Sequence, residues 1–206
     1  MFRKCLTTYC HNVLYFNFLL VLFFGCRENN AQEENQELEF RVDTALLAPC
    51  YSDSLLKFVF CPPKGWNPLP DSTLKQVKTR LETNIQPTHI IQFRLIQLFL
   101  DPTNGNSCSL SQVSGVVGTL VDLIEIYEES LQEKFPKAEI SKAKFKIEKI
   151  NVVQFLILTD EKVIFKLIFA SPTKAICQLD FAVARAVYPN VVRSVESSVG
   201  SLRPMF

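Results

Sequence analysis

Histidine is scarce in this chain of 206 residues, which contains only His11 and His89. We expect His11 to be removed with an N-terminal leader, and His89 alone cannot build a typical zinc site of histidine and cysteine ligands. The cysteines show no C-x-x-C spacing, so they do not indicate a metal site either. The sequence therefore predicts neither a metal nor another cofactor.

Catalytic motifs are also missing. The sequence contains no Gly-x-Ser-x-Gly motif for a serine nucleophile. Residues 114–118 (SGVVG) are rich in glycine but lack the lysine of a phosphate-binding loop, and we interpret them as a loop that enters a helix. We therefore expect a protein that is not an enzyme, with a hydrolase of unrecognised serine or carboxylate site as the alternative.

Charge of one sign does not accumulate in this chain. It has 22 Lys and Arg against 21 Asp and Glu, a formal net charge of +1, and no long basic or acidic run. This balance gives no electrostatic reason to expect a nucleic-acid partner. Hydrophobic residues make up 48% of the chain, which is enough for a sizeable core.

The N-terminal residues have the order of a secretory signal. Arg3 and Lys4 precede residues 13–24, which are apolar except for Asn17, and a polar stretch follows Cys26. The apolar run is shorter than the roughly 20 residues that a membrane-spanning helix needs. We therefore predict a signal peptide over residues 1–25, with cleavage just before Cys26.

The residues at the predicted cut, Phe23-Phe24-Gly25-Cys26, resemble the lipobox of bacterial lipoproteins. The resemblance implies that the Cys26 thiol carries a diacylglyceryl group and that its freed amine is acylated, for example with palmitate. More than one acyl chain is needed for stable anchoring. The lipobox pattern prefers Leu and Ser or Ala where Phe23 and Phe24 stand, so a plain secreted protein and an uncleaved anchor remain alternatives.

The polar stretch after Cys26 bears on location. We assign residues 26–45 to a lipidated flexible tether and residues 46–206 to the folded domain, because residues 27–40 are rich in Glu, Asn and Gln. Arg27 stands where an Asp would indicate retention in the inner membrane, by resemblance to enterobacterial sorting. We therefore expect a lipid-anchored protein of the cell envelope, at the outer membrane.

Periodicity along the domain predicts strands interspersed with three helices. The helices are expected at residues 71–84, 117–135 and 188–202, from apolar side chains at helical spacing. Strands are expected at residues 55–61, 89–100, 107–113, 139–150, 152–159, 163–170 and 175–183. Apolar content on both faces of 89–100 suggests a central strand. The pattern predicts an α+β fold, an α-β-α sandwich around a mostly antiparallel sheet.

The last two predicted strands give a register. Aligning them across their loop places Phe165, Leu167 and Phe169 on the core face with Cys177, Leu179 and Phe181. The same alignment puts Lys166 opposite Asp180 on the other face. We therefore predict a cross-strand ion pair between these two residues.

Two segments of the domain resemble PsbP-like domains. The first is residues 58–66 (FVFCPPKGW), and the second runs from residues 178–181 (QLDF) through Tyr188 to residues 197–202. That family includes the photosystem II extrinsic protein, a Ran-binding import factor and bacterial lipoproteins. The resemblance implies the same α-β-α sandwich and a role in binding a partner protein or small ligand, or as a structural or assembly accessory at the outer membrane. It assigns no functional residue to this chain.

A few residues remain as candidates for a role in binding or stability. Cys50, Cys61, Cys108 and Cys177 could form disulfides in an oxidising compartment, and the sequence leaves the pairing open. Trp66 is either a binding anchor or a residue that closes the core. Arg94 and Asp180 could share a polar stripe with Gln92, Gln154 and Gln178, either lining a groove or forming an ion pair under a helix.

Overall fold

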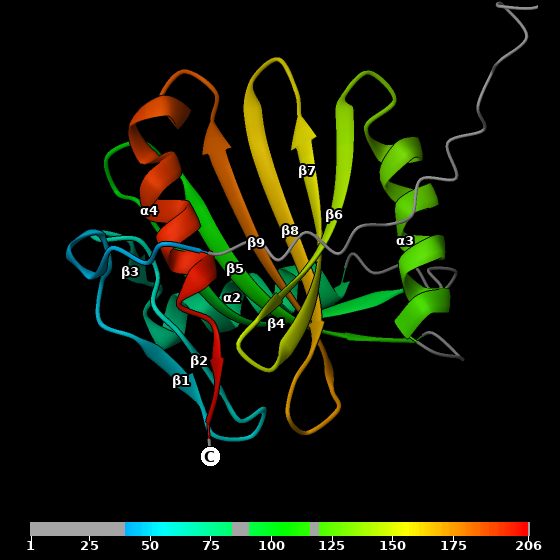
Figure 1. Cartoon of the computed structure of the whole chain (residues 1–206), viewed down its shortest axis with the longest axis horizontal. Helices are drawn as coiled ribbons and strands as arrows, with labels where there is room; N and C mark the ends of the chain where they lie inside the picture. The colour runs from blue at the N-terminus through cyan, green and yellow to red at the C-terminus, as the bar shows by residue number, and fades with distance from the viewer. Residues whose placement is uncertain (1–39, 84–90, 116–119, 206) are drawn as a thin grey trace, which may run out of the picture. The chain divides into compact units, whose positions relative to one another are not determined.

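The central element of the fold is a seven-stranded, fully antiparallel sheet (Figure 1). The computed structural model describes residues 40–83, 91–115 and 120–205, which lie within the compact unit Asn35–Phe206. The strands, in spatial order, are β3 (Asn67–Pro68), β4 (Gln92–Leu100), β5 (Ser107–Ser114), β9 (Ile176–Ala184), β8 (Lys162–Ala170), β7 (Ile150–Leu158) and β6 (Glu139–Ile147).

Helices cover both faces of this sheet. Helix α4 (Tyr188–Gly200) packs Val195 and Val199 into the core that contains Leu167 and Leu179. Helix α3 (Leu120–Lys134) packs Tyr127 and other apolar residues into a separate core on the opposite face. The predicted α+β class and the layered α-β-α arrangement are thus confirmed.

Helix α2 (Asp71–Thr83) starts where the sequence predicted it. The apolar side chains at helical spacing are only partly covered, because Leu74 is buried whereas Leu81 remains 49% exposed. The helix lies beside β4, and Leu74 in its first turn is buried.

A second, three-stranded sheet lies against the α4 face of the large sheet. It is formed by β1 (Tyr51–Asp53), β2 (Phe58–Phe60) and β10 (Arg203–Pro204). Phe58 packs edge-on against Phe169, with 5.3 Å between ring centroids, and Phe60 packs against Phe99 at 5.5 Å. The strand predicted over residues 55–61 is shorter than expected, because a turn occupies residues 54–57.

Strand β4 is not the central strand that its apolar content suggested. Among the described strands, only β5 pairs along its length, while β3 pairs with Leu100 and Phe99 alone. A shift in register between Leu95 and Gln97 reverses the direction in which its side chains point. Phe93 therefore lies in the α3 core and Phe99 in the α4 core, although uninterrupted alternation along the strand would place both on one face.

The register predicted for β8 and β9 is confirmed. Phe165 pairs with Phe181 and Leu167 with Leu179, and both pairs lie in the α4 core. Lys166 pairs with Asp180 on the other face, where Nζ lies 2.7 Å from Oδ2.

The segment formed by residues 40–46, which we call the strap, crosses α4. The Phe40 ring packs against Phe145 of β6 at a centroid distance of 5.0 Å, and the backbone N–H of Asp43 donates to Ser197 Oγ of α4 at 3.1 Å. Gly200 permits this close approach, because a Cβ atom there would lie 2.6 Å from Phe40 Cβ. The packed part of the molecule therefore includes residues that the sequence assigned to the tether.

Candidate functional site

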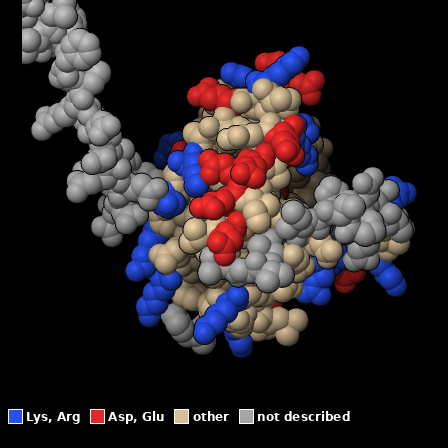
Figure 2. Space-filling model, turned by 90° about the vertical axis from the view of Figure 1, so that its right-hand side faces the viewer, with Lys and Arg blue, Asp and Glu red and all other residues tan. Residues whose placement is uncertain are grey.

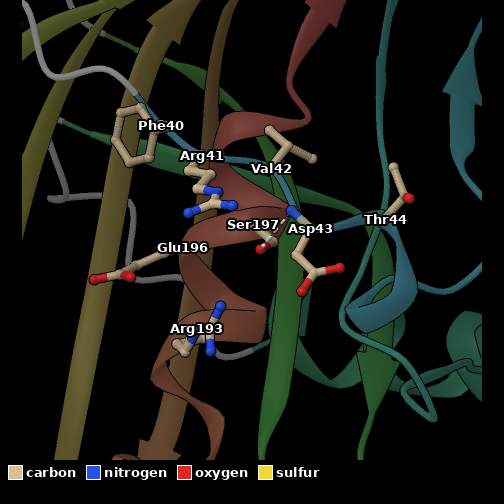
Figure 3. Close-up of a pocket in the computed structure, with 8 residues that line it drawn as sticks. All are labelled: Phe40, Arg41, Val42, Asp43, Thr44, Arg193, Glu196 and Ser197. Carbon is tan, nitrogen blue, oxygen red and sulfur yellow. Dashed lines mark hydrogen bonds between the residues drawn. The ribbon is translucent and has the colours of Figure 1, made fainter.

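The strap and α4 together enclose a surface pocket of about 680 Å³ (Figure 3). Ser197 lies at its base, and Phe40, Val42 and Thr44 contribute part of the wall. Four charged side chains surround the space: Arg41 and Asp43 from the strap, and Arg193 and Glu196 from α4. The pocket exists only because the strap lies across the helix.

Most charged side chains of this pocket have no ion-pair or hydrogen-bond partner among the described residues. Among the residues that the structure describes, Arg41, Arg193 and Glu196 make no ion pair and no side-chain hydrogen bond. Asp43 is partly engaged, since its Oδ1 accepts the backbone N–H of Ala45 at 3.1 Å and caps the short helix η1 (Thr44–Leu46). Two guanidinium groups and one free carboxylate are therefore available to a ligand.

The sequence did not point to this pocket. Arg193 and Glu196 are three residues apart and so share one face of α4, which a helical reading could have shown. Their closeness to Arg41 depends on how the strap packs on α4, and no local sequence pattern predicts that packing.

A polar group lies between the sheet and α3. Asp180 accepts hydrogen bonds on Oδ2 from Lys166 Nζ and from Gln178 Nε2, each at 2.7 Å. Burial raises the pKa of the nearby Tyr127 hydroxyl well above its ordinary value, and the negative charge of Asp180 raises it further. A hydrogen bond with the Gln178 side chain lowers the pKa in part. Of the two alternatives for Asp180, the structure thus has the ion pair on the helix-covered face.

The single polar stripe proposed for the sheet does not form. Arg94 pairs in register with Gln112 and hydrogen-bonds its side chain, and Gln112 in turn pairs with Cys177 of the α4 core. Gln154 pairs with Leu167, also on the α4 side. Asp180 and Gln178 point to the α3 side, so the predicted set is divided between the two faces.

Two cysteines of the domain form a disulfide, and two are free thiols. Cys50 and Cys61 form a disulfide that links the start of β1 to the end of β2. Cys108 and Cys177 are free thiols buried in the α4 core. Burial raises the pKa of Cys177 to about 12 and that of Cys108 well above its usual value, so neither is a nucleophilic thiolate at neutral pH.

Trp66 closes the core and is not an exposed anchor. Its side chain is 4% exposed, and its ring centroid lies 6.3 Å from that of Phe181.

Asp101 has a structural role as well. Burial opposes ionisation of Asp101, but hydrogen bonds from Asn104, Thr103 and Asn106 hold its pKa below the ordinary value and fix the loop between β4 and β5.

The predicted lipidation residue and both histidines lie outside the part of the chain that the structure describes. These residues are Cys26, His11 and His89. Across residues 40–83, 91–115 and 120–205, no group of three or more His, Cys, Asp or Glu side chains is placed to hold a metal ion. None of the described helices has the length and hydropathy to cross a membrane.

The exposed face of α3 is strongly acidic. Figure 2, which faces this side of the molecule, shows a band of acidic side chains. Glu125, Glu129 and Glu133 are exposed there, and Glu128 pairs with Lys142 of β6 at 2.6 Å. These exposed carboxylates form the solvated side of the helix.

Comparison with known proteins finds a likeness of structure but none of sequence. No family model matches the sequence, and no curated protein matches it either. The solution structure of cyanobacterial PsbP (CyanoP) from Synechocystis sp. PCC 6803 is similar, with a TM-score of 0.47 and 12% sequence identity. The alignment covers 77% of this chain and 93% of that one. At this level the likeness says nothing about function.

Proposed function

We propose that this chain is a lipid-anchored protein of the cell envelope, at the outer membrane, whose α+β domain binds a small ligand or partner protein without catalysis. The observation that carries the anchoring is the Phe23-Phe24-Gly25-Cys26 motif after an apolar run too short to span a bilayer. The observation that favours binding is the pocket between the strap and α4, with its free charged side chains.

Two features support a non-catalytic role. The buried thiols of Cys108 and Cys177 are held in the protonated form. Asp180, the carboxylate under α3, accepts hydrogen bonds from Lys166 and Gln178 and thereby serves to join β8 to β9. Neither arrangement pairs a nucleophile with a general base.

Cys26→Ser tests the anchor. We expect the wild-type chain to fractionate with membranes and to yield a mature N-terminal peptide whose mass includes acyl chains on Cys26. The variant should keep residues 1–25 and carry no lipid, since the serine hydroxyl does not replace the thiol that is alkylated.

Cys108→Ser is the matched control, because it also removes one thiol sulfur but lies in the folded domain. It should leave the mass of the N-terminal peptide unchanged. A wild-type N-terminus at another residue, or one without fatty acid, would contradict the proposal.

A further inference from the structure

We propose that the pocket between the strap and α4 binds a phosphate group that carries a primary amine, and that its source is the ethanolamine headgroup of a membrane phospholipid. The inference deepens the proposed function and rests on it for the source of the ligand. The chemistry of the pocket itself is independent of the anchor.

The phosphate half of the ligand is matched by two guanidinium groups. Arg41 comes from the strap and Arg193 from α4. Both side chains line the pocket, as Figure 3 shows. Planar guanidinium groups donate pairs of hydrogen bonds to phosphate oxygens. Since neither arginine has an ion-pair partner among the described residues, both can donate to a bound phosphate.

The amine half is matched by carboxylates. Glu196 has no ion-pair partner among the described residues, and Asp43 keeps Oδ2 free of the hydrogen bond that occupies Oδ1. A primary ammonium donates three hydrogen bonds, whereas a quaternary ammonium has no N–H and donates none. The alternation of two cations and two anions around one space therefore favours a zwitterion with an ethanolamine end over a simple anion or a choline.

The position of the pocket favours a lipid as the source. The strap continues directly into the chain that leads back to Cys26, with residues 27–39 between them. Thirteen residues span at most roughly 45 Å in any conformation. If Cys26 carries acyl chains, the pocket is confined to that distance from the bilayer, where headgroups are abundant. The acidic helix α3 belongs to the opposite face of the sheet, so its charge is directed away from this pocket.

Titration in solution tests the pocket without a bilayer. The purified full chain, in detergent if it is acylated, would be titrated with glycerophosphoethanolamine, glycerophosphocholine and inorganic phosphate while its NMR spectrum is recorded. We expect glycerophosphoethanolamine to bind at least tenfold more tightly than the other two and to shift the signals of residues 40–46 and α4.

Variants identify the side chains responsible. Arg41→Gln with Arg193→Gln should weaken glycerophosphoethanolamine at least tenfold, and Glu196→Gln should abolish its advantage over glycerophosphocholine. The control, Lys75→Gln with Lys137→Gln, removes the same charge from exposed positions outside the pocket and should bind like the wild type. Equal binding of the three probes, or an unchanged affinity of the double arginine variant, would overturn the proposal.

Vesicles distinguish a lipid from a free metabolite. The chain would be placed on phosphatidylcholine vesicles with and without phosphatidylethanolamine, and amide hydrogen exchange would be measured. We expect residues 40–46 to exchange several-fold more slowly when phosphatidylethanolamine is present, and this protection to vanish in the double arginine variant. Binding in solution without protection on vesicles would assign the pocket to a free amine phosphate and overturn the lipid source. A chain that lacks lipid yet binds glycerophosphoethanolamine would overturn the anchor and leave the pocket intact.

Discussion

Asp180 shows how a single residue depends on the layer that covers it. Its partner Lys166 has a side chain that is 12% exposed, and its own side chain is 21% exposed. The pair between Lys142 and Glu128 has a similar length, but its side chains are 30% and 33% exposed. Ion pairs shielded from water gain more from pairing and lose more when one partner is removed.

The residue-level prediction compares these two pairs. Lys166→Gln should lower the free energy of unfolding by about 1–3 kcal/mol, because it leaves a largely buried carboxylate without its cation. Lys142→Gln should cost less than about 1 kcal/mol, since its partner stays in contact with water. Urea denaturation at neutral pH measures both.

The double variant Lys166→Met with Asp180→Leu provides the control for this comparison. Replacement of the whole pair by apolar side chains of similar size should restore much of the lost stability. Equal losses for Lys166→Gln and Lys142→Gln would show that burial under α3 does not set the strength of the pair.

At the level of elements, hydrogen bonds hold the small sheet to α4, and a disulfide closes the hairpin within that sheet. The backbone N–H of Cys61 donates to Ser201 Oγ at 2.8 Å, and Ser198 Oγ donates to the Cys61 carbonyl at 2.6 Å. The disulfide from Cys61 to Cys50, eleven residues earlier, closes the hairpin of β1 and β2. The two hydrogen bonds fix the hairpin to the end of α4.

The element-level prediction concerns that disulfide. Cys50→Ala with Cys61→Ala should lower the free energy of unfolding by about 2–3 kcal/mol, because the crosslink restricts the unfolded chain over a short loop. Thermal denaturation with and without reductant checks it. Reductant should destabilise the wild type and leave the variant unchanged, and a wild type insensitive to reductant would argue against a disulfide in the native protein.

At the level of the whole molecule, the strap joins parts that are distant in sequence. Phe40 contacts β6, Asp43 contacts α4, and the Leu46 carbonyl accepts a hydrogen bond at 2.8 Å from the backbone N–H of Lys64, which follows β2. The strap thus connects the large sheet, the last helix and the small sheet. Its docking also forms the candidate pocket.

The molecule-level prediction tests this docking. In Gly200→Ala, the new Cβ would meet Phe40 Cβ at 2.6 Å and Val42 Cγ2 at 2.9 Å, so the strap must move. We expect a loss of about 1–3 kcal/mol from overpacking and faster tryptic cleavage at Arg41. Ser194→Ala is the control, since Ser194 lies on α4 and, within the described part of the chain, its hydroxyl bonds only to the Val191 carbonyl. Unchanged cleavage at Arg41 would mean that the strap does not depend on close contact with Gly200.

Local pattern was sufficient for much of the fold. The helices at α3 and α4, the three strands β7, β8 and β9, and the pairing of Lys166 with Asp180 followed from periodicity and loop length alone. These elements are long and strongly patterned, and adjacent strands joined by short loops leave few choices of register. The α+β class follows from the same order of elements.

What only the tertiary structure decided were the contacts between segments far apart in sequence. The bulge in β4 divides Phe93 and Phe99 between two cores, and the docking of the strap brings Arg41 to Arg193 and Glu196. A prediction from periodicity assumes that side chains alternate without interruption, and it uses only residues that are close together in the sequence. The bulge and the strap arise from packing over long distances, so no local pattern encodes them.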